Sequence, residues 1–539
     1  MAISYIPDTK RPAWTYQPDV DQRTPGILIS GSANVVPTTA GGFRPANTAP
    51  LAASQIDQPT YPAVGARVVG SRYLLRNDGT DRLFAGTATK IYEANQVAAY
   101  AWTDESRAGD YSGVTQWMFD QYGATSLAAA SLGTRTEIQF STGTVGTSFA
   151  NLTNAPKAKI IVAQDNALYA FNYDPAGTAF PDGWIRTDTG NITNWTPGSG
   201  ECVSGTFLEA PGDITAAIKH GTGVVVWKSR GMWRGQYVGL PEVVRWELIS
   251  PEIGCVGPLA AVNIHDCIYF LDASGFWVYD GSRPRLLSEG IWGDLRNQFL
   301  PSPANITGTQ FGVDDVSKVI SIHLIGAGSV GVGYFNYHYE TGAWGPFCQH
   351  TINGTSTAQQ VSSVCNGPFE KITQTPGIDG AITNANAYWF IVGSSGTYDL
   401  RAHIGTKLVS GSAPSDLLFH AYTIVPSLFG SDDRGQSITR LYHDFSSYTL
   451  VLGGSGALET TTDTLQVNRR PFGRGTTQAT KTGTYNDTLG YTDIIANGNW
   501  FKETLSFVAR GSAASDVVAL NFEWLGFHPE KAPASAPRN

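Results

Sequence analysis

The stretch GCVGPLAAVNIHDCIYFLDASGFWVYDGSRPRLLS, residues 254–288, shows the pattern that decides the fold of this chain. An apolar run at 267–271 is followed by a turn sequence at 272–275, an aromatic run at 276–279 and a second turn at Asp280 and Gly281. Short apolar runs separated by Asp, Gly and Ser turns are typical of consecutive antiparallel hairpins. The stretch therefore predicts one blade of a β-propeller.

Similar units recur on both sides of this stretch. Residues 213–250 contain four strand-length pieces joined by short turns, and a further unit spans 306–347. The stronger units begin near residues 114, 158, 213, 258 and 307, and a spacing of roughly 45 residues is that of propeller blades. We predict a β-propeller over residues 61–410 with about six blades built from divergent repeats, and five or seven blades stay open.

The flanking segments differ in character. Residues 1–60 are rich in Pro, Thr, Ala and Gly and predict an extended N-terminal arm, which either needs a partner for order or is a floppy terminus. Beyond residue 411 longer alternating runs appear, and residues 411–530 predict an additional C-terminal β-sandwich-like domain. Residues 531–539 predict a disordered tail, and residues 290–300 predict one short helix.

Composition supports an all-β protein and limits its partners. Among 539 residues there are 60 Gly, 14 Trp, 23 Tyr and 24 Phe, whereas only 15% of residues are charged. Many turns and aromatics with few charged helix faces favour β-structure. The net charge of −9 argues against nonspecific DNA binding through a basic face. An acidic surface would instead repel phosphates and let DNA slide past without sticking.

The cysteines and the N-terminus indicate where the chain is made. Cys202, Cys255, Cys267, Cys348 and Cys365 are odd in number, widely spaced and form no CxxC motif, so we expect buried free thiols in a reducing compartment. The opening residues, MAISYIPDTKRPAW, lack the features of a signal peptide. No apolar run approaches the roughly 20 residues of a membrane helix, so we expect no membrane segment and assembly in the cytoplasm.

One glycine-rich motif resembles a dinucleotide site. Gly326, Gly328 and Gly331 have the GxGxxG spacing after an apolar strand. A dinucleotide site needs a helix to follow, because the helix N-terminus faces the pyrophosphate. The residues that follow, VGYFNYHY, alternate as a strand does. We therefore interpret the motif as a glycine-rich hairpin turn.

The other candidate motifs also favour structural interpretations. TDTGNITNWT, residues 187–196, has the wrong spacing for a sialidase Asp-box, so we expect a turn with Trp195 packed between blades. The doublets Asp314/Asp315 and Asp432/Asp433 lie in turn-like sequences and predict solvated turns. Trp and Tyr clusters, which a sugar platform would also use, predict core packing between blades. We assign no catalytic, cofactor-binding or metal-binding residue, and we predict that the protein is not an enzyme.

An ordered succession of segments carries a family resemblance. It runs from WMFDQYGATSLAAA through FANLTNAPKAKIIVAQDNALYAF, GNITNWTPG and DITAAIKHGTGVVVWKSRGMWRGQYVGLP to GCVGPLAAVNIHDCIYFLDASGFWVYDG. This succession, which covers residues 117–288, resembles the tail nozzle (tail tubular) proteins of short-tailed bacteriophages. The C-terminal region is similar to that family only in general character.

The resemblance implies a structural virion protein of the viral tail, built on a β-propeller and assembled in the host cytoplasm. It implies a homo-oligomeric ring, a hexamer, that lies below the portal and its head-to-tail adaptor and near the tail fibres or tailspikes. The lumen of that ring would retain the genome and carry viral double-stranded DNA outward at ejection, without sequence-specific binding. Two other functions stay open: a carbohydrate-binding propeller for host attachment, and a propeller glycosidase with carboxylates that converge from different blades.

Overall fold

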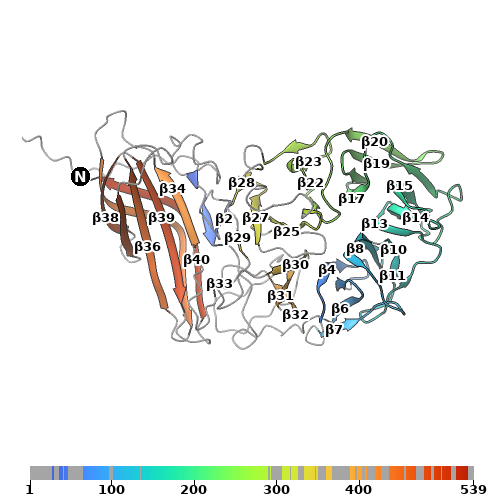
Figure 1. The fold of residues 1–539 in the computed structure, drawn as a ribbon, viewed down its shortest axis with the longest axis horizontal. Coiled ribbons are helices and arrows are strands. Elements are labelled where there is room, and N and C mark those ends of the chain that lie inside the picture. Colours follow the sequence, from blue (N-terminus) through green and yellow to red (C-terminus); the bar gives the residue numbers. More distant parts are fainter. Residues whose placement is uncertain are drawn as a thin grey trace, which may run out of the picture.

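A ring of small antiparallel sheets lies beside one large sheet in the computed structural model of the chain (Figure 1). The structure describes residues 27–28, 35–39, 42–45, 65–79, 81–95, 101–133, 135–288, 292, 306–315, 317–325, 333–345, 348–349, 360–366, 389–394, 397–402, 407–408, 419–425, 436–453, 457–468, 479–486, 491–498, 500–510 and 517–531. Every element whose bounds lie within these residues is a β-strand, and Trp292 by itself has a helical backbone. No helix in the described part of the chain is long and apolar enough to cross a membrane.

The first three sheets of the ring follow one another in the chain, and we call them blades 1 to 3. Blade 1 contains β4 (Val68–Leu75), β5 (Asp81–Thr87), β6 (Ile91–Asn95) and β7 (Ala101–Asp104). Blade 2 contains β8 (Val114–Tyr122), β9 (Thr125–Gly133), β11 (Gln139–Ser141) and β12 (Ala150–Asn151). Blade 3 contains β10 (Thr136–Glu137), β13 (Lys157–Gln164), β14 (Ala167–Asp174), β15 (Phe180–Arg186) and β16 (Val203–Thr206).

Four further sheets complete the ring as blades 4 to 7. Blade 4 contains β17 (Ile214–His220), β18 (Gly223–Lys228), β19 (Met232–Gly239) and β20 (Val243–Ser250). Blade 5 contains β21 (Ala261–Ile264), β22 (Cys267–Asp272), β23 (Gly275–Tyr279) and β24 (Arg285–Leu286). Blade 6 contains β25 (Gln310–Asp314), β26 (Val319–His323), β27 (Gly333–His338), β28 (Ala343–Trp344) and β29 (Cys348–Gln349). Blade 7 contains β30 (Gln360–Cys365), β31 (Trp389–Ser394) and β32 (Thr397–Ala402).

The sheets close into a propeller. The inner strands β4, β8, β13, β17, β21, β25 and β30 contact one another in this order, and β30 contacts β4 again. The predicted all-β propeller of about six divergent blades is confirmed: six sheets have four or five strands, and a three-stranded seventh sheet completes the circle. Residues 254–288, which show the hairpin pattern most clearly, contain the four strands of blade 5. Residues 213–250 contain the four strands of blade 4.

Tight turns of one kind join the inner strand of a blade to the next strand. Asp165 and Asn166 between β13 and β14 have positive φ angles of 53° and 52°, and His265 and Asp266 between β21 and β22 have 48° and 62°. Two consecutive residues with positive φ form the two-residue hairpin turn whose twist matches that of antiparallel strands. Among residues with a side chain, Asn and Asp tolerate a positive φ best. The Asp and Asn residues at these corners therefore fix the hairpin registers.

Large aromatic side chains fill the space between adjacent blades. Trp117 of β8 is fully buried, and its indole nitrogen donates a hydrogen bond to the Thr87 carbonyl of blade 1 at 2.7 Å. A Cβ atom at Gly86 would lie 2.1 Å from the Trp117 ring, so only glycine leaves room for it. Trp227 and Phe270 make a comparable contact between blades 4 and 5, with ring centroids 5.1 Å apart.

The C-terminal strands are longer and form an eleven-stranded sheet together with N-terminal strands. The path of hydrogen-bonded strands turns at β37, and β39 contacts β40 of the other half, so the two halves are layered as the predicted β-sandwich-like arrangement requires. Its strands are β1 (Ile27–Leu28), β2 (Val35–Pro37), β3 (Phe43–Pro45), β33 (Lys407–Leu408), β34 (Phe419–Val425), β35 (Gln436–Gly453), β36 (Ala457–Asn468), β37 (Ala479–Asn486), β38 (Tyr491–Gly498), β39 (Trp500–Arg510) and β40 (Val517–Lys531).

A short N-terminal hairpin, β2–β3, links this sheet to the propeller, and we call it the strap. β3 pairs with β40 through Phe43 and Trp524, which joins the strap to the large sheet. On its other side Val36, only 3% exposed, packs with Tyr334 and Cys348 of blade 6. In Figure 1 the strap lies between the two regions. The described parts of the predicted arm, residues 1–60, are thus strands of the large sheet.

Some predictions fall on residues that the structure does not describe. The helix expected at 290–300 lies outside the described residues except for Trp292, and the tail at 531–539 lies outside them except for Lys531. The Asp432/Asp433 doublet also lies outside them. The domain boundaries at residues 60, 410 and 530 stay predictions.

Candidate functional site

The inner strands of the propeller surround a central cavity of about 840 Å³. Its wall is largely apolar, and charged or amide side chains from several blades reach it near the ends of the inner strands. These polar residues are Arg72, Asp120, Gln121, Lys219, Asn263, His265, Asp266, Gln310, Asp315 and Asn366. The cavity lies in the size range of ligand pockets, roughly 300–1,000 Å³. The cavity is therefore the leading candidate for a binding or catalytic site.

Asp120 and Lys219 join three blades at the cavity. The Lys219 Nζ of blade 4 lies 2.8 Å from the Asp120 Oδ1 of blade 2. The other carboxylate oxygen of Asp120 accepts a 2.7 Å hydrogen bond from the backbone N–H of Ala163 in blade 3, which lies between them. Both oxygens of a nearly buried carboxylate are thus used to hold neighbouring blades together.

Asp315 has a similar role between blades 5 and 6. Its Oδ1 accepts a 2.6 Å hydrogen bond from the Tyr339 hydroxyl and lies 3.1 Å from His265 Nε2 of blade 5 and 3.3 Å from Lys318 Nζ. The Tyr339 hydrogen bond, with those from His265 and Lys318, holds the pKa of Asp315 below its ordinary value. Burial and the adjacent carboxylate raise the pKa of Tyr339. Asp315 therefore stays ionised at neutral pH.

Amide and imidazole groups join the remaining blades on this side. His220 Nε2 lies 2.8 Å from the Asp266 carbonyl oxygen, which connects blades 4 and 5. The side-chain amide of Asn263 donates to the Lys219 carbonyl at 3.0 Å across the same boundary. Gln164 of blade 3 donates to the Gly221 carbonyl of blade 4 at 3.2 Å. Polar side chains thus join consecutive blades around the cavity.

The closure of the ring is also polar and buried. Ser71 Oγ of blade 1 lies 2.8 Å from Ser363 Oγ of blade 7. Ser363 Oγ donates in turn to Gln310 Oε1 of blade 6 at 3.2 Å, and the same oxygen accepts the Val364 backbone N–H at 2.7 Å. Because buried hydrogen-bonding groups are costly to leave unpaired, this network favours the closed register.

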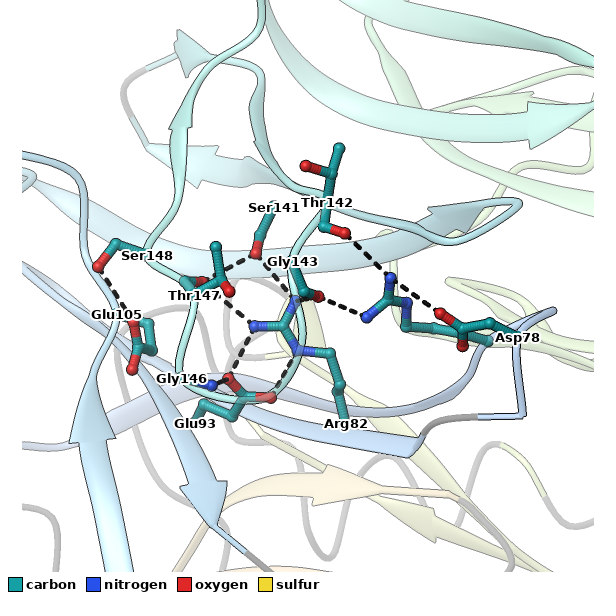
Figure 2. A network of polar contacts seen from close by, with 11 residues as sticks. Asp78, Arg82, Glu93, Glu105, Ser141, Thr142, Gly143, Gly146, Thr147 and Ser148 are labelled. Atoms are coloured by element: carbon teal, nitrogen blue, oxygen red, sulfur yellow. Dashed lines mark hydrogen bonds and ion pairs between the residues drawn. The ribbon is translucent and has the colours of Figure 1, made fainter.

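A second polar cluster lies between blades 1 and 2 (Figure 2). Arg82 and Glu93 form a bidentate ion pair with distances of 2.5 and 2.7 Å, and their side chains are 0% and 1% exposed. The guanidinium also donates to Ser141 Oγ at 2.9 Å and to the Thr147 carbonyl at 3.2 Å. Glu93 accepts the Gly146 backbone N–H at 3.0 Å. We call this cluster the clamp.

The clamp fixes the loop that precedes β12. The guanidinium of Arg76 donates to the carbonyls of Gly143 and Thr142 at 2.6 and 3.2 Å, so the turn after β4 reaches the same loop. Figure 2 shows Arg82 pointing toward this loop, and Ser148 donating a hydrogen bond to Glu105 at the far end of the loop. Because the polar atoms of the buried Arg82–Glu93 pair all have hydrogen-bond partners, the pair keeps the loop in position and has no group free for proton transfer.

The chemistry available to this arrangement is narrow. Within the described residues no three His, Cys, Asp or Glu side chains are grouped to hold a metal ion. Four of the five cysteines are buried, as predicted, and Cys267 is half-buried. Burial raises the pKa of the Cys202 thiol to about 11 and those of Cys255 and Cys365 to about 12, so these thiols are poor nucleophiles.

The motifs singled out in the sequence have structural positions. The GxGxxG glycines lie outside the described residues, but β26 and β27 on either side of them pair as an antiparallel hairpin, so a strand follows as predicted. Trp195 is buried in a cluster that includes Leu127 of blade 2 and Ile161 of blade 3, which confirms its packing between blades. Asp314 is the last residue of β25 and Asp315 follows it in a turn, where Asp315 is engaged by His265 rather than simply solvated.

Apart from Asp315, which the sequence singled out as part of a turn, sequence reasoning missed the cavity residues and the clamp. Arg82 and Glu93 stand on neighbouring strands in a run that otherwise suggests ordinary strand pairs, and a charged residue on each of two paired strands was their only signal. Asp120 and Lys219 are 99 residues apart in the chain, and neither belongs to a recognisable motif. The assignment of no catalytic, cofactor-binding or metal-binding residue stays a prediction.

Comparison with known proteins gives distant structural likenesses only. No protein-family model matches the chain, and no curated protein matches its sequence. Among solved structures, PorZ, an essential bacterial surface component of the type-IX secretion system of Porphyromonas gingivalis, is 12% identical with a TM-score of 0.34, over 70% of this chain and 44% of that chain. The extracellular domain of a hybrid two component system from B. thetaiotaomicron is 12% identical with a TM-score of 0.36, over 72% and 44%. The chain spans less than half the length of either structure, and the fold assignment rests on the strand pairing described above.

Proposed function

We propose that the chain is a structural protein of a bacteriophage tail, whose copies assemble into a ring-shaped nozzle below the portal and its adaptor. The observation that carries the proposal is the use of the polar groups at the central cavity. Asp120, Lys219, Asn263 and Asp315 line the cavity and are engaged in contacts between blades, as a structural wall requires and as a catalytic site does not. The sequence resemblance over residues 117–288 supports the same function.

In this proposal the DNA passes between copies and not through the propeller itself. The central cavity of about 840 Å³ has the size of a pocket for a small molecule. The lumen would therefore be the space that a ring of copies encloses. Six copies of a chain with a net charge of −9 would carry about −54, and this charge would repel phosphates and limit adhesion of DNA to the wall.

The remaining parts of the proposal concern partners and place. The ring would contact the portal or adaptor on one side and tail fibres or tailspikes nearby, and it would be a component of the virion assembled in the host cytoplasm. Closed rings built from one kind of copy need head-to-tail contacts between two different surfaces.

Electron microscopy of the purified full chain, alone and mixed with a phage head-to-tail adaptor, tests the proposal. We expect rings with cyclic symmetry and a central opening wide enough for a DNA duplex. Particles that stay monomeric in both mixtures would overturn the proposal. A strongly basic lumen in the rings would overturn the acidic-wall part of it alone.

The central cavity is the observation that favours a second candidate function, that of a carbohydrate-binding or glycosidase propeller. Asp120, Asp266 and Asp315 reach the cavity from three different blades, as a glycosidase would need. Against this, Asp315 has a lowered pKa and Asp120 is paired with Lys219, whereas a general acid needs a raised pKa. The aromatic residues of the wall, Tyr73, Phe119 and Phe311, are at most 8% exposed and offer no stacking platform.

A glycan array and an assay for release of reducing sugar from host polysaccharide separate the two functions. The structural proposal expects neither binding nor turnover. Glycan binding that is lost in Asp266→Asn would establish the cavity as a carbohydrate site. Turnover that is lost in the same variant would establish a glycosidase.

A further inference from the structure

The polar groups that line the central cavity fall into two sets, and the first set is used within the protein. The ion pairs of Asp120 and Asp315 belong to the contacts between blades described above. The side-chain amide of Asn366, which follows β30 of blade 7, accepts the Val313 backbone N–H of blade 6 at 2.9 Å and donates to the Phe311 carbonyl at 2.7 Å. These groups are occupied by contacts within the chain.

Arg72 and Asp266 form the second set. Both residues line the cavity and are exposed, and neither side chain forms a hydrogen bond or ion pair with another residue that the structure describes. Ser71 and Tyr73, on either side of Arg72 in β4, are buried, so the exposed surface of Arg72 faces the cavity. Among the described residues of the wall, Arg72 is thus a free cation and Asp266 a free anion.

The two free charges belong to well-separated blades. Arg72 lies in β4 of blade 1 and Asp266 in the turn after β21 of blade 5, and in a ring of seven blades these positions face each other across the cavity. A ligand that contacts both must therefore carry its own two charges apart. A free amino acid has both charges attached to one carbon atom, whereas a peptide with free ends has them at opposite ends of a chain.

The wall also offers apolar surface and an amide group. Leu75 ends β4, lines the cavity and is 54% exposed, so it has apolar surface that the described chain leaves uncovered. The half-buried Gln121 of β8 lines the cavity, and its side-chain amide forms no hydrogen bond with a described residue. An amide donates to a peptide carbonyl and accepts from a peptide N–H. The wall therefore complements the ends, the backbone and an apolar side chain of a peptide.

We propose that the central cavity binds a short peptide with free ends and apolar side chains. The peptide carboxylate pairs with the guanidinium of Arg72, whose planar fork matches two carboxylate oxygens, and the peptide ammonium group pairs with Asp266. Because the wall is largely apolar, these charge contacts are stronger than they are at an open surface. The site lies within one copy of the chain, so the proposal goes beyond the ring function and does not depend on it.

Isothermal titration calorimetry of the full chain with trileucine tests the ends of the ligand. We expect saturable binding of one peptide per chain. Acetylation of the amino end and amidation of the carboxyl end each remove one charge, and each should weaken binding at least about tenfold because a charge-assisted contact is lost. Leucine alone should bind at least about tenfold more weakly than trileucine. These measurements use the unaltered chain, so they do not depend on the folding of a variant.

Two variants assign the ends of the peptide to their partners. Arg72→Gln should weaken trileucine binding at least about tenfold and leave the binding of trileucine amide unchanged, since the amide has no carboxylate to lose. Asp266→Asn should weaken trileucine binding in the same way and leave the binding of N-acetyl-trileucine unchanged. Arg230→Gln and Glu209→Gln are the matched controls, because both residues are exposed and neither lines the cavity. Circular dichroism establishes that all four variants fold.

The results that overturn the proposal are distinct. It fails if trileucine shows no saturable binding, or if the free and end-blocked peptides bind equally. It fails in the same way if Arg72→Gln weakens trileucine amide as much as trileucine, because the guanidinium then does not hold the carboxylate. Equal binding of leucine and trileucine would exclude a peptide as the ligand. Each titration reports on the cavity of a single copy, so none of these results decides whether copies form a ring.

Discussion

The propeller and the large C-terminal sheet obtain their cohesion in different ways. Among the described strands of the ring, β8 and β9 are the longest with nine residues each, whereas β35 has 18 residues and β40 has 15. β35 and β40 pair from Ile438↔Lys531 to Gly453↔Val517, so backbone hydrogen bonds hold the large sheet along its length. In the ring, side chains such as Trp117 and Arg82 hold one short sheet against the next.

This difference indicates where each region is sensitive to mutation. A ring of separate sheets is only as stable as the contacts between them, because no described strand of one blade pairs with a strand of another blade. A continuous sheet spreads its stability over many backbone pairs. Single substitutions at blade boundaries should therefore have large effects, and the strap should show how far the two regions depend on each other.

The largest effect is expected at the clamp. Glu93→Gln removes one charge of a fully buried ion pair and leaves Arg82 without its counter-ion, which should cost about 3–5 kcal/mol of stability. Urea unfolding followed by tryptophan fluorescence measures this loss. Glu242→Gln is the control, because its ion pair with Arg245 is exposed and its midpoint should not move. A normal midpoint for Glu93→Gln would show that the clamp does not hold blades 1 and 2.

A smaller loss is expected where glycine makes room for an aromatic ring. Gly86→Ala places a Cβ atom 2.1 Å from Trp117 Cδ1, so the ring must shift, at a cost of about 1–3 kcal/mol. Gly65→Ala is the control, since no atom lies within 4 Å of its added Cβ. Equal stability of the two variants in the same urea titration would contradict the tight packing between blades 1 and 2.

A substitution in the strap should lower the stability of the fold by an intermediate to small amount. Val36→Ala removes two methyl groups from a buried contact with blade 6 and should cost about 1.6 kcal/mol. If the strap couples the two regions, the variant should also be cut faster by a protease near the strap. Val145→Ala, at a position 38% exposed, is the control. Unchanged proteolysis in Val36→Ala would mean that the contact does not hold the large sheet to the propeller.

The smallest effect is expected at Asp315, and it depends on pH. Its folded pKa is lowered, so its carboxylate stabilises the fold above the unfolded pKa near 3.9, and this contribution is lost as pH falls through the folded pKa. Asp315→Asn should therefore melt at a lower temperature than the unaltered chain at pH 7, and the gap should narrow below about pH 4. An exposed carboxylate serves as control in Glu209→Gln. A gap independent of pH would exclude the proposed role of the charge.

The sequence predicts the local parts of this fold well. Turn residues such as Asp165 and Asn166 lie next to the strands they connect, so their φ preferences and the alternation around them define each hairpin. The repeat of hairpin pairs then predicts the propeller. Two further predictions rest on local sequence. The glycine-rich hairpin follows from the strand pattern of the residues after the glycines, and the burial of Trp195 follows from the size of its side chain.

Long-range pairings are not visible in the same way. Nothing in the residues around Phe43 specifies Trp524 as the strand partner, because a strand of only three residues fits many edges. The Ser71–Ser363 contact that closes the ring uses two residues that are common in turns and on surfaces. The ion pair between Asp120 and Lys219 depends on the ring geometry that positions blade 2 and blade 4 around one cavity. These features follow from tertiary structure and not from sequence pattern.

The closure of the ring by Ser71 and Ser363 also has a consequence during synthesis. The two residues are 292 positions apart, and a ribosome that adds about 5–20 residues per second needs roughly 15 to 60 s to make the intervening chain. Through this interval β4 has no β30 beside it, and the nascent propeller is an open arc. The strap remains without its strand partner for a longer time, because Phe43 of β3 pairs with Trp524 of β40, which is synthesised after β30. Translation speed therefore sets how long the first blade stays open to pairing with a strand from another polypeptide.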